Sequence, residues 1–157
     1  MRAIVYISGL VIGLLLVLSS FAPATAENFA EPQVEGGLAV VVNSKGAPNE
    51  IPLSKLKVIL KGEQQRWKDG TKITLAFMKT STGIGEDMAK RIFGMTAKEL
   101  NKYFLAQVFQ GKMSSPQFFD SEEDLLKYIK NNEGTIGVTS FKNASGTTIS
   151  VDGKKAI

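Results

Sequence analysis

The residues best suited to chemistry form one short polar segment between a predicted strand and a predicted helix: Lys79, Thr80, Ser81, Thr82, Gly83, Ile84 and Gly85. Such a loop leaves backbone N–H groups unpaired at a helix N-terminus, lets the chain approach a ligand at the glycines and adds three hydroxyl donors. The expected chemistry is the binding of an oxyanion, with Lys79 supplying a positive charge. The composition also fits a plain helix cap, in which Ser81 or Thr82 is the N-cap and Glu86 and Asp87 complete the first turn.

Most other chemistry is excluded by composition. The 157 residues include no His and no Cys, which removes most zinc sites, redox sites and nucleophilic dyads or triads. We therefore expect no enzyme activity, no metal and no cofactor. The acidic run Glu122, Glu123 and Asp124 is compatible with a cation site, but a solvated first helical turn explains it equally. The net charge of +4 is dispersed along the chain, so we expect no nucleic-acid partner.

The N-terminus has the pattern of an export signal. Arg2 precedes an apolar run from Ala3 to Phe21, and Ala24 and Ala26 form an Ala-x-Ala site. This order predicts a secretory signal peptide over residues 1–26 and a mature protein in the periplasm. An uncleaved membrane anchor is the alternative, because the run approaches the roughly 20 residues that span a bilayer. Cleavage after Ala26 leaves 131 residues, enough for one domain.

The candidate loop must be positioned by the elements of that domain. Residues 27–37 are polar and are expected to form a flexible leader, with the domain over residues 38–157. Apolar periodicity, caps and turn residues predict eight elements in this domain. They are strands at 38–42, 72–77, 135–138 and 147–151 and helices at 53–61, 86–93, 97–110 and 122–132.

Local signals sharpen several of these expectations. The first strand is continuously apolar, as in a strand covered on both faces, whereas the second alternates as in a half-buried strand. Thr96 with Glu99, and Ser121 with Asp124, have the spacing of helix N-terminal caps. The element order β-α-β-α-α-α-β-β predicts an α/β fold with a small mixed β-sheet and flanking helices.

The exposed or buried state of the aromatic residues is left open by the sequence. Trp67, between Arg66 and Lys68, suits either ligand stacking or a core position, of which the core position is the commoner. Phe118 and Phe119 follow Pro116 and are expected to pack, or else to form a surface patch with Tyr128.

Several short motifs resemble the phosphate ABC transporter substrate-binding protein family, which has the type II periplasmic binding-protein fold. They occur in the family's order across residues 38–155: Leu38 to Asn43; Leu53, Ser54, Leu56, Ile59, Leu60, Lys61 and Gly62; Trp67, Lys68, Asp69 and Gly70; Ile92, Phe93 and Gly94; Val108, Phe109, Gln110, Gly111 and Lys112; and Asn132 to Val138. The chain resembles one lobe of that fold rather than two.

This resemblance implies a site and a partner. In the family, phosphate is held by hydroxyls and helix N-terminal amides of a Ser, Gly and Thr-rich loop, usually with an Arg. The matching loop is residues 81–84, while the position of the Arg falls on Gly85 and leaves Lys79 as the nearby cation. An Arg offers a bidentate fork that a Lys lacks. Family members also close two lobes over the ligand, so a single lobe implies a homodimer or a membrane transporter or sensor as cover.

The loop composition and the family resemblance together predict two alternative functions. The first is a periplasmic solute-binding-like protein that binds phosphate or a related oxyanion at residues 79–85, linked to phosphate uptake or sensing. The alternative is an envelope protein-interaction module, derived from a binding-protein lobe that has lost its ligand.

Overall fold

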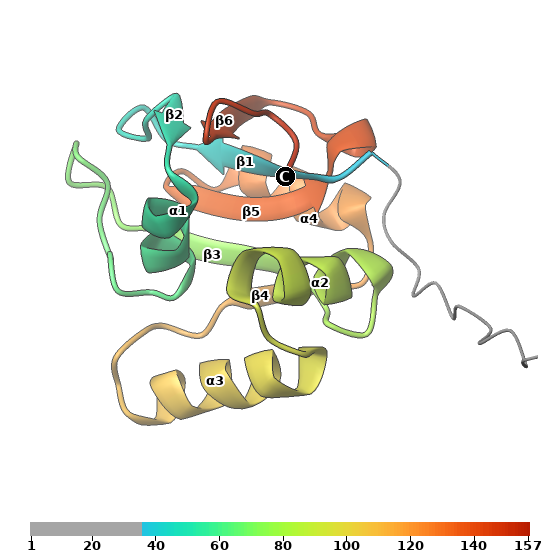
Figure 1. Ribbon diagram of the computed structural model, residues 1–157. Coiled ribbons are helices and arrows are strands. Elements are labelled where there is room, and N and C mark those ends of the chain that lie inside the picture. The colour runs from blue at the N-terminus through green and yellow to red at the C-terminus, as the bar shows by residue number, and fades with distance from the viewer. Residues whose placement is uncertain (1–35) are drawn as a thin grey trace, which may run out of the picture.

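The computed structural model describes residues 36–157, which build one six-stranded mixed sheet with helices on both faces (Figure 1). The predicted signal peptide and residues 27–35 of the predicted leader lie outside the described residues. The strand order is β2-β6-β1-β5-β3-β4. The strands are β1 (Leu38–Asn43), β2 (Glu50–Ile51), β3 (Thr74–Met78), β4 (Gln117–Phe119), β5 (Thr135–Ser140) and β6 (Thr147–Val151).

The helices divide between the two faces of the sheet. The helical elements are α1 (Leu53–Leu60), α2 (Gly83–Met88), the π-helix η1 (Ala89–Phe93), α3 (Ala97–Phe109), α4 (Glu122–Asn131) and the 3-10 helix η2 (Phe141–Asn143). Side chains of α1, α2, η1 and α3 form the larger core with one face of the sheet. Those of α4 form a smaller core with Val41, Ala76 and Met78 on the opposite face. The predicted mixed α/β class is confirmed.

Three strands define the edge that matters for the site. β3 pairs in parallel with β4 on one side and with β5 on the other, so the carboxyl ends of all three meet at one edge of the sheet. β1 runs antiparallel to β5 with Val40 opposite Val138, and antiparallel to β6. Ligands of open α/β sheets commonly bind beyond the carboxyl ends of parallel strands.

Strand β3 differs from its predicted half-buried character. Leu75, Ala76, Phe77 and Met78 are all buried, because helices cover both of its faces. The alternation with polar residues ends at Thr74, so the buried part of β3 reads as a continuous apolar run. The sequence pattern located the strand correctly but assigned one face wrongly to solvent.

Two strands were missing from the predicted order. β2 lies between the predicted strand 38–42 and the predicted helix 53–61, and β4 contains Phe118 and Phe119. Their lengths of two and three residues are too short to show a period of two. Both lie at the edges of the sheet, where pairing with one neighbour defines them.

The predicted helices are confirmed with one shift. The helical segment preceding Gly94 begins at Gly83 rather than Glu86, and its second half is a π-helix, so the candidate loop is shorter than expected. Thr96 and Glu99 form the predicted capping box of α3, and the Ser121 hydroxyl accepts from the Asp124 N–H at the start of α4. Trp67 is a core residue, with its indole N–H donating to the Gly134 carbonyl at 2.9 Å.

The first residue of α4 ties this helix to the carboxyl end of β5. The Glu122 carboxylate accepts from the Thr139 hydroxyl, from the N–H and hydroxyl of Ser140, and from the Asn143 side-chain amide at 2.8 Å. Burial raises the pKa of Glu122, but these donors outweigh it and hold the pKa below its ordinary value of 4.5. Glu122 is therefore a structural anchor rather than a solvated first-turn residue.

We expect Glu122→Gln to lower the free energy of unfolding by about 1–2 kcal/mol at pH 7, because the variant loses hydrogen bonds to a charged acceptor. A carboxyl with a depressed pKa in the folded state stabilises above its unfolded pKa, and that contribution disappears as the pH falls through the folded value. The difference from the parent should therefore shrink below about pH 4. Urea unfolding of Glu122→Gln and of the exposed neighbour variant Glu123→Gln measures it; equal losses in both would contradict the anchor.

Candidate functional site

The candidate loop lies at the shared carboxyl edge of β3, β4 and β5. It leaves β3 at Met78 and enters α2 at Gly83, and the Lys79 N–H donates to the Phe119 carbonyl of β4 at 2.9 Å. The chain leaving β4 enters α4 at the same edge, after Asp120 and Ser121. Two helix N-termini therefore start beside the ends of two adjacent strands, where unpaired N–H groups favour negative charge.

Thr82 closes the loop on itself. Its hydroxyl accepts from the Gly85 N–H at 3.1 Å and donates to the Lys79 carbonyl at 2.7 Å, while its own N–H donates to the same carbonyl at 2.9 Å. Thr82 is therefore the N-cap that the sequence offered as one of two interpretations. The Thr82 hydroxyl proton and one of its oxygen lone pairs are therefore both used in hydrogen bonds within the protein.

Gly85 is a packing residue at the point where the helix meets the loop. It is buried, and a Cβ at this position would collide with the Lys79 carbonyl, lying 2.6 Å from its carbon and 2.9 Å from the Thr80 Cα. The obstacle is backbone, so a larger residue requires the whole turn to move. The position that the family resemblance assigns to an Arg therefore holds no side chain, and the Gly85 N–H is already bonded to Thr82.

Lys79, the cation expected to face the anion, is paired. Its ammonium lies 2.7 Å from the Asp120 carboxylate, and the two side chains remain 47% and 76% exposed. The pair forms because Lys79 and Asp120 directly follow parallel neighbours, which ends both strands at the same edge. Sequence reasoning missed Asp120, since only the pairing of β4 with β3 brings it to the loop.

The remaining hydroxyls are arranged differently. The Thr80 hydroxyl accepts from the side-chain amide of Asn101 on α3 at 2.7 Å, which leaves its proton free to donate elsewhere. Ser81 is exposed, and within residues 36–157 its side chain makes no hydrogen bond. In the same part of the chain the N–H groups of Gly83 and Ile84 are also without acceptors. Asn101 gave no sequence signal, because it is 21 residues away from Thr80 on another helix.

Glu86 and Asp87, the acidic residues that the sequence placed in the first helical turn, have separate roles, and only Glu86 lies in that turn. Glu86 lies 3.7 Å from Lys90 one turn along the helix. Asp87 is buried, and its carboxylate lies 3.4 Å from the guanidinium of Arg91. Arg91 also donates to the Ile157 carbonyl at 3.3 Å. Arg91 therefore links this helical segment to the C-terminal residue, and Asp87 pairs with Arg91 within the segment.

Neither a metal cluster nor a membrane-spanning helix occurs in the described part of the chain. Across residues 36–157, no group of three or more acidic side chains is placed to hold a metal ion. No helix in that range is long and apolar enough to cross a bilayer. In the acidic run at the start of α4, Glu122 is bound by donors from the end of β5, and the Asp124 N–H donates to the Ser121 cap.

Solved structures of phosphate-binding proteins share this fold. An ABC-type phosphate transport receptor from Vibrio cholerae aligns with a TM-score of 0.59 and 16% identity, over 77% of this chain and 48% of its own. A phosphate-binding protein from Stenotrophomonas maltophilia aligns with a TM-score of 0.60 and 12% identity, over 77% of this chain and 40% of its own. PstS from Borrelia burgdorferi aligns with a TM-score of 0.55 and 18% identity, over 77% of this chain and 49% of its own. The chain thus spans less than half the length of these proteins.

These similarities establish the fold. The described domain has the α/β architecture of one part of phosphate-transport binding proteins, and the resemblance drawn from the sequence motifs is confirmed at that level. No protein-family model matches the sequence. No curated protein matches it either.

We expect Thr82→Ala to lower the free energy of unfolding by about 1 kcal/mol, because the α2 cap and the tie to Lys79 are both lost. Thr82→Ser keeps the hydroxyl and should retain most of the stability. Ser81→Ala should change it by less than about 0.5 kcal/mol, since the side chain is exposed. Chemical denaturation of the three variants tests the assignment, and a Ser81→Ala loss as large as that of Thr82→Ala would reverse it.

Proposed function

We propose that this protein is a periplasmic solute-binding-like protein that binds phosphate or a related oxyanion at Lys79–Gly85. The supporting observation is the placement of this loop at an edge where three parallel strand ends and two helix N-termini converge. Such an edge is the common ligand position of open α/β sheets, and helix N-termini favour anions.

The proposed contacts come from the groups that the fold leaves available. The hydroxyls of Thr80 and Ser81 and the N–H groups of Gly83 and Ile84 donate to the anion. Thr82 and Gly85 shape the loop, since their polar groups are already paired. Asn101 orients the Thr80 hydroxyl by occupying one of its lone pairs.

Lys79 makes binding conditional on its partner. An arriving anion must share the ammonium with the Asp120 carboxylate or displace it, because the two groups are in contact. Repulsion between Asp120 and the anion weakens binding by an amount that salt reduces, since both side chains are exposed. The proposed site is therefore one of modest affinity.

The cellular role is proposed by analogy with the fold neighbours. Those proteins are described as phosphate-binding proteins or phosphate transport receptors. We propose a corresponding part in phosphate uptake or sensing, without enzyme activity, next to a membrane transporter or sensor. A homodimer or that membrane partner would cover the open site.

Export is proposed from the N-terminal sequence. Residues 1–26 form a signal peptide, residues 27–37 a leader and residues 38–157 the binding domain, with the mature domain in the periplasm. Retention of residues 1–26 as an anchor is the competing outcome, which mass spectrometry of the exported protein distinguishes.

A protein-interaction module without ligand is the second candidate. Two observations favour it: Gly85 provides no side chain where the family resemblance places an Arg, and Asp120 already neutralises Lys79. Phe118 is 37% exposed beside Phe104 on the α3 side of β4, whereas Phe119 packs on Tyr128 on the α4 side, so the two rings do not form one surface patch. A chain that shows no response to oxyanions would favour this function.

We expect millimolar phosphate to raise the thermal unfolding midpoint by several degrees, whereas sulfate at matched ionic strength gives a smaller rise. A ligand at 100 times its dissociation constant adds about 2.7 kcal/mol to the native state, which corresponds to a measurable shift in a domain of this size. Ser81→Ala should reduce the shift without altering the unliganded midpoint. Ser114→Ala, an exposed serine in the loop before β4, is the matched control; equal shifts in both variants would refute the proposed contact.

We expect Asp120→Asn to bind phosphate more tightly, by up to about fivefold at low salt, because it releases Lys79 and removes a repulsive charge. Lys79→Met should bind more weakly than the parent. Titration calorimetry at two salt concentrations measures both, with Asp124→Asn as the control for general loss of negative charge at this edge. A decrease in affinity for Asp120→Asn would show that the carboxylate contributes to binding instead.

A further inference from the structure

The outer face of α3 combines exposed apolar and basic side chains in one stripe, named here the α3 stripe: Lys98, Lys102, Leu105 and Phe109. The spacing of four, three and four residues keeps these positions on one side of a helix. Leu105 is 59% exposed and Phe109 is 83% exposed. They are the two most exposed large apolar residues within the described part of the chain.

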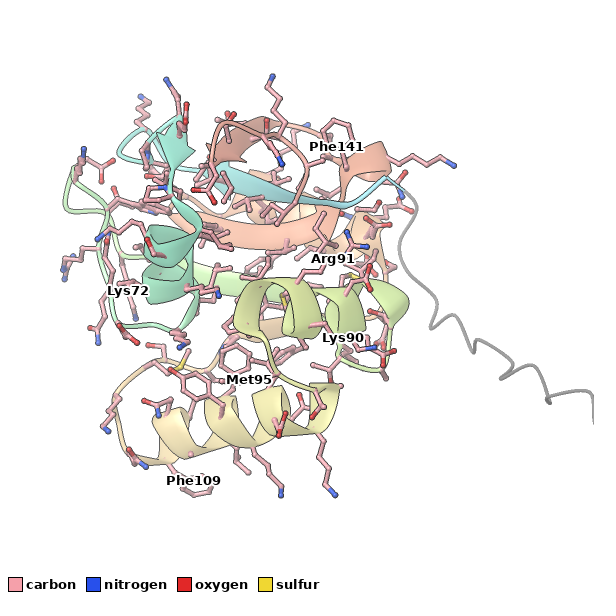
Figure 2. All side chains as sticks on the ribbon, in the orientation of Figure 1. Lys72, Lys90, Arg91, Met95, Phe109 and Phe141 are labelled. Carbon is pink, nitrogen blue, oxygen red and sulfur yellow. The ribbon has the colours of Figure 1, made fainter. Side chains whose placement is uncertain are left out.

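This stripe has no role in the core. The opposite side of α3 is occupied by Leu100 and Phe104, which are buried against the sheet. Phe104 stacks on Phe77 with ring centroids 5.5 Å apart. α3 lies at one extreme of the molecule (Figure 1), and Phe109 points away from the body of the domain (Figure 2). The α3 stripe is thus the outermost surface at this end.

The charge around the stripe is predominantly positive. Lys98 and Lys102 lie within it, and the exposed Lys112 follows the helix, where its carbonyl accepts from Gln65. Glu99 is the single acidic residue in α3, and its carboxylate is engaged by the N–H and hydroxyl of Thr96 at 2.8 and 2.9 Å. A partner that covers the stripe must therefore bring negative charge and accept apolar side chains.

We propose that the α3 stripe docks the protein on an anionic phospholipid surface. Leu105 and Phe109 enter the boundary between headgroups and acyl chains, while Lys98, Lys102 and Lys112 stay at the level of the lipid phosphates. The basic and apolar side chains share one side of α3 and are divided along its length. The C-terminal end of α3 therefore enters more deeply, and the long stems of the lysines carry their ammonium groups to the lipid phosphates. The lipid surface supplies the negative charge that the stripe lacks, in two dimensions and along the whole helix.

A second copy of the chain fits the stripe less well. In an antiparallel pair of α3 helices, the lysines of one copy would face the Leu105 and Phe109 end of the other. Glu99, the one carboxylate on the helix, is already held by Thr96. Such a pair would gather four lysines around four apolar side chains without an acidic complement, which opposes association.

The proposal predicts weak and reversible docking that orients the domain. Two apolar side chains and three lysines bind less strongly than a membrane-spanning segment. The candidate loop at residues 79–85 contacts the same helix, because Asn101 of α3 donates to the Thr80 hydroxyl. Docking of α3 would therefore fix the orientation of this loop relative to the membrane. The inference is independent of whether that loop binds phosphate.

The absence of Cys allows a single environment-sensitive probe to test this in the full chain. Ala106→Cys, which is exposed beside the stripe, is labelled with a nitrobenzoxadiazole dye. The protein is mixed with vesicles of phosphatidylcholine alone or with phosphatidylglycerol. We expect a blue shift and protection from a soluble quencher with the anionic vesicles. The apolar segment Ala3–Phe21 would bring the chain to either vesicle, so the probe reports on α3 itself.

Three comparisons make the test decisive. The same dye on Phe141→Cys, at the opposite end of the molecule in Figure 2, should not respond. At saturating lipid, Lys98→Glu with Lys102→Glu should lower the ratio of quencher-protected to unprotected probe by about tenfold or more, because each nearby lysine contributes about fivefold to docking. Leu105→Ser with Phe109→Ser should remove the protection. Circular dichroism confirms folding, which these exposed positions should leave intact.

Each other outcome overturns the proposal. No response at position 106 with anionic vesicles would exclude lipid docking and direct attention to an acidic protein partner. Equal responses at positions 106 and 141 would show non-specific adsorption. A response that survives both double variants would place the contact elsewhere.

Discussion

The parallel pairing of β3 with β4 and β5 is the constraint on which the rest of the domain depends. It brings three strand ends to one edge, and the chain must leave each strand there. β3 and β4 are each followed by a helix, so α2 and α4 begin side by side at the same edge. β5 instead ends at Ser140, whose N–H and hydroxyl bind the first residue of α4. Polar groups therefore collect at this edge for topological reasons.

The groups at this edge divide between structure and availability. Thr82, Gly85 and Glu122 are committed to caps, close packing and the anchor of α4. Ser81 and the first amides of α2 are not committed, and Thr80 is held by Asn101 in a position that leaves its proton free. Lys79 is intermediate between these two groups, because its ion pair with Asp120 is exposed and breaking it costs little free energy. A loop with this division can hold an anion without losing the turn that shapes it.

The fold was predictable wherever a segment is long enough to show a period. β1, α1, α3 and α4 follow apolar spacing, caps and terminating glycines within a residue or two of their predicted bounds. β2 and β4 were not predictable, because strands of two and three residues have no period. β3 was located, but its burial on both faces depends on α4 crossing behind the sheet, which no local pattern shows.

For the site, the sequence by itself determined a hydroxyl and glycine segment at a strand-to-helix junction, because these residue types favour turns and helix caps. The structure ends the loop at Thr82, the N-cap of α2. The sequence also determined that His and Cys chemistry is absent. Only the tertiary structure decided what each residue of the loop does. Asp120 and Asn101, 41 and 21 residues away from their partners Lys79 and Thr80, reach the loop through strand pairing and helix packing. Such long-range contacts leave no spacing signal, because they depend on how the elements are assembled and not on neighbours along the chain.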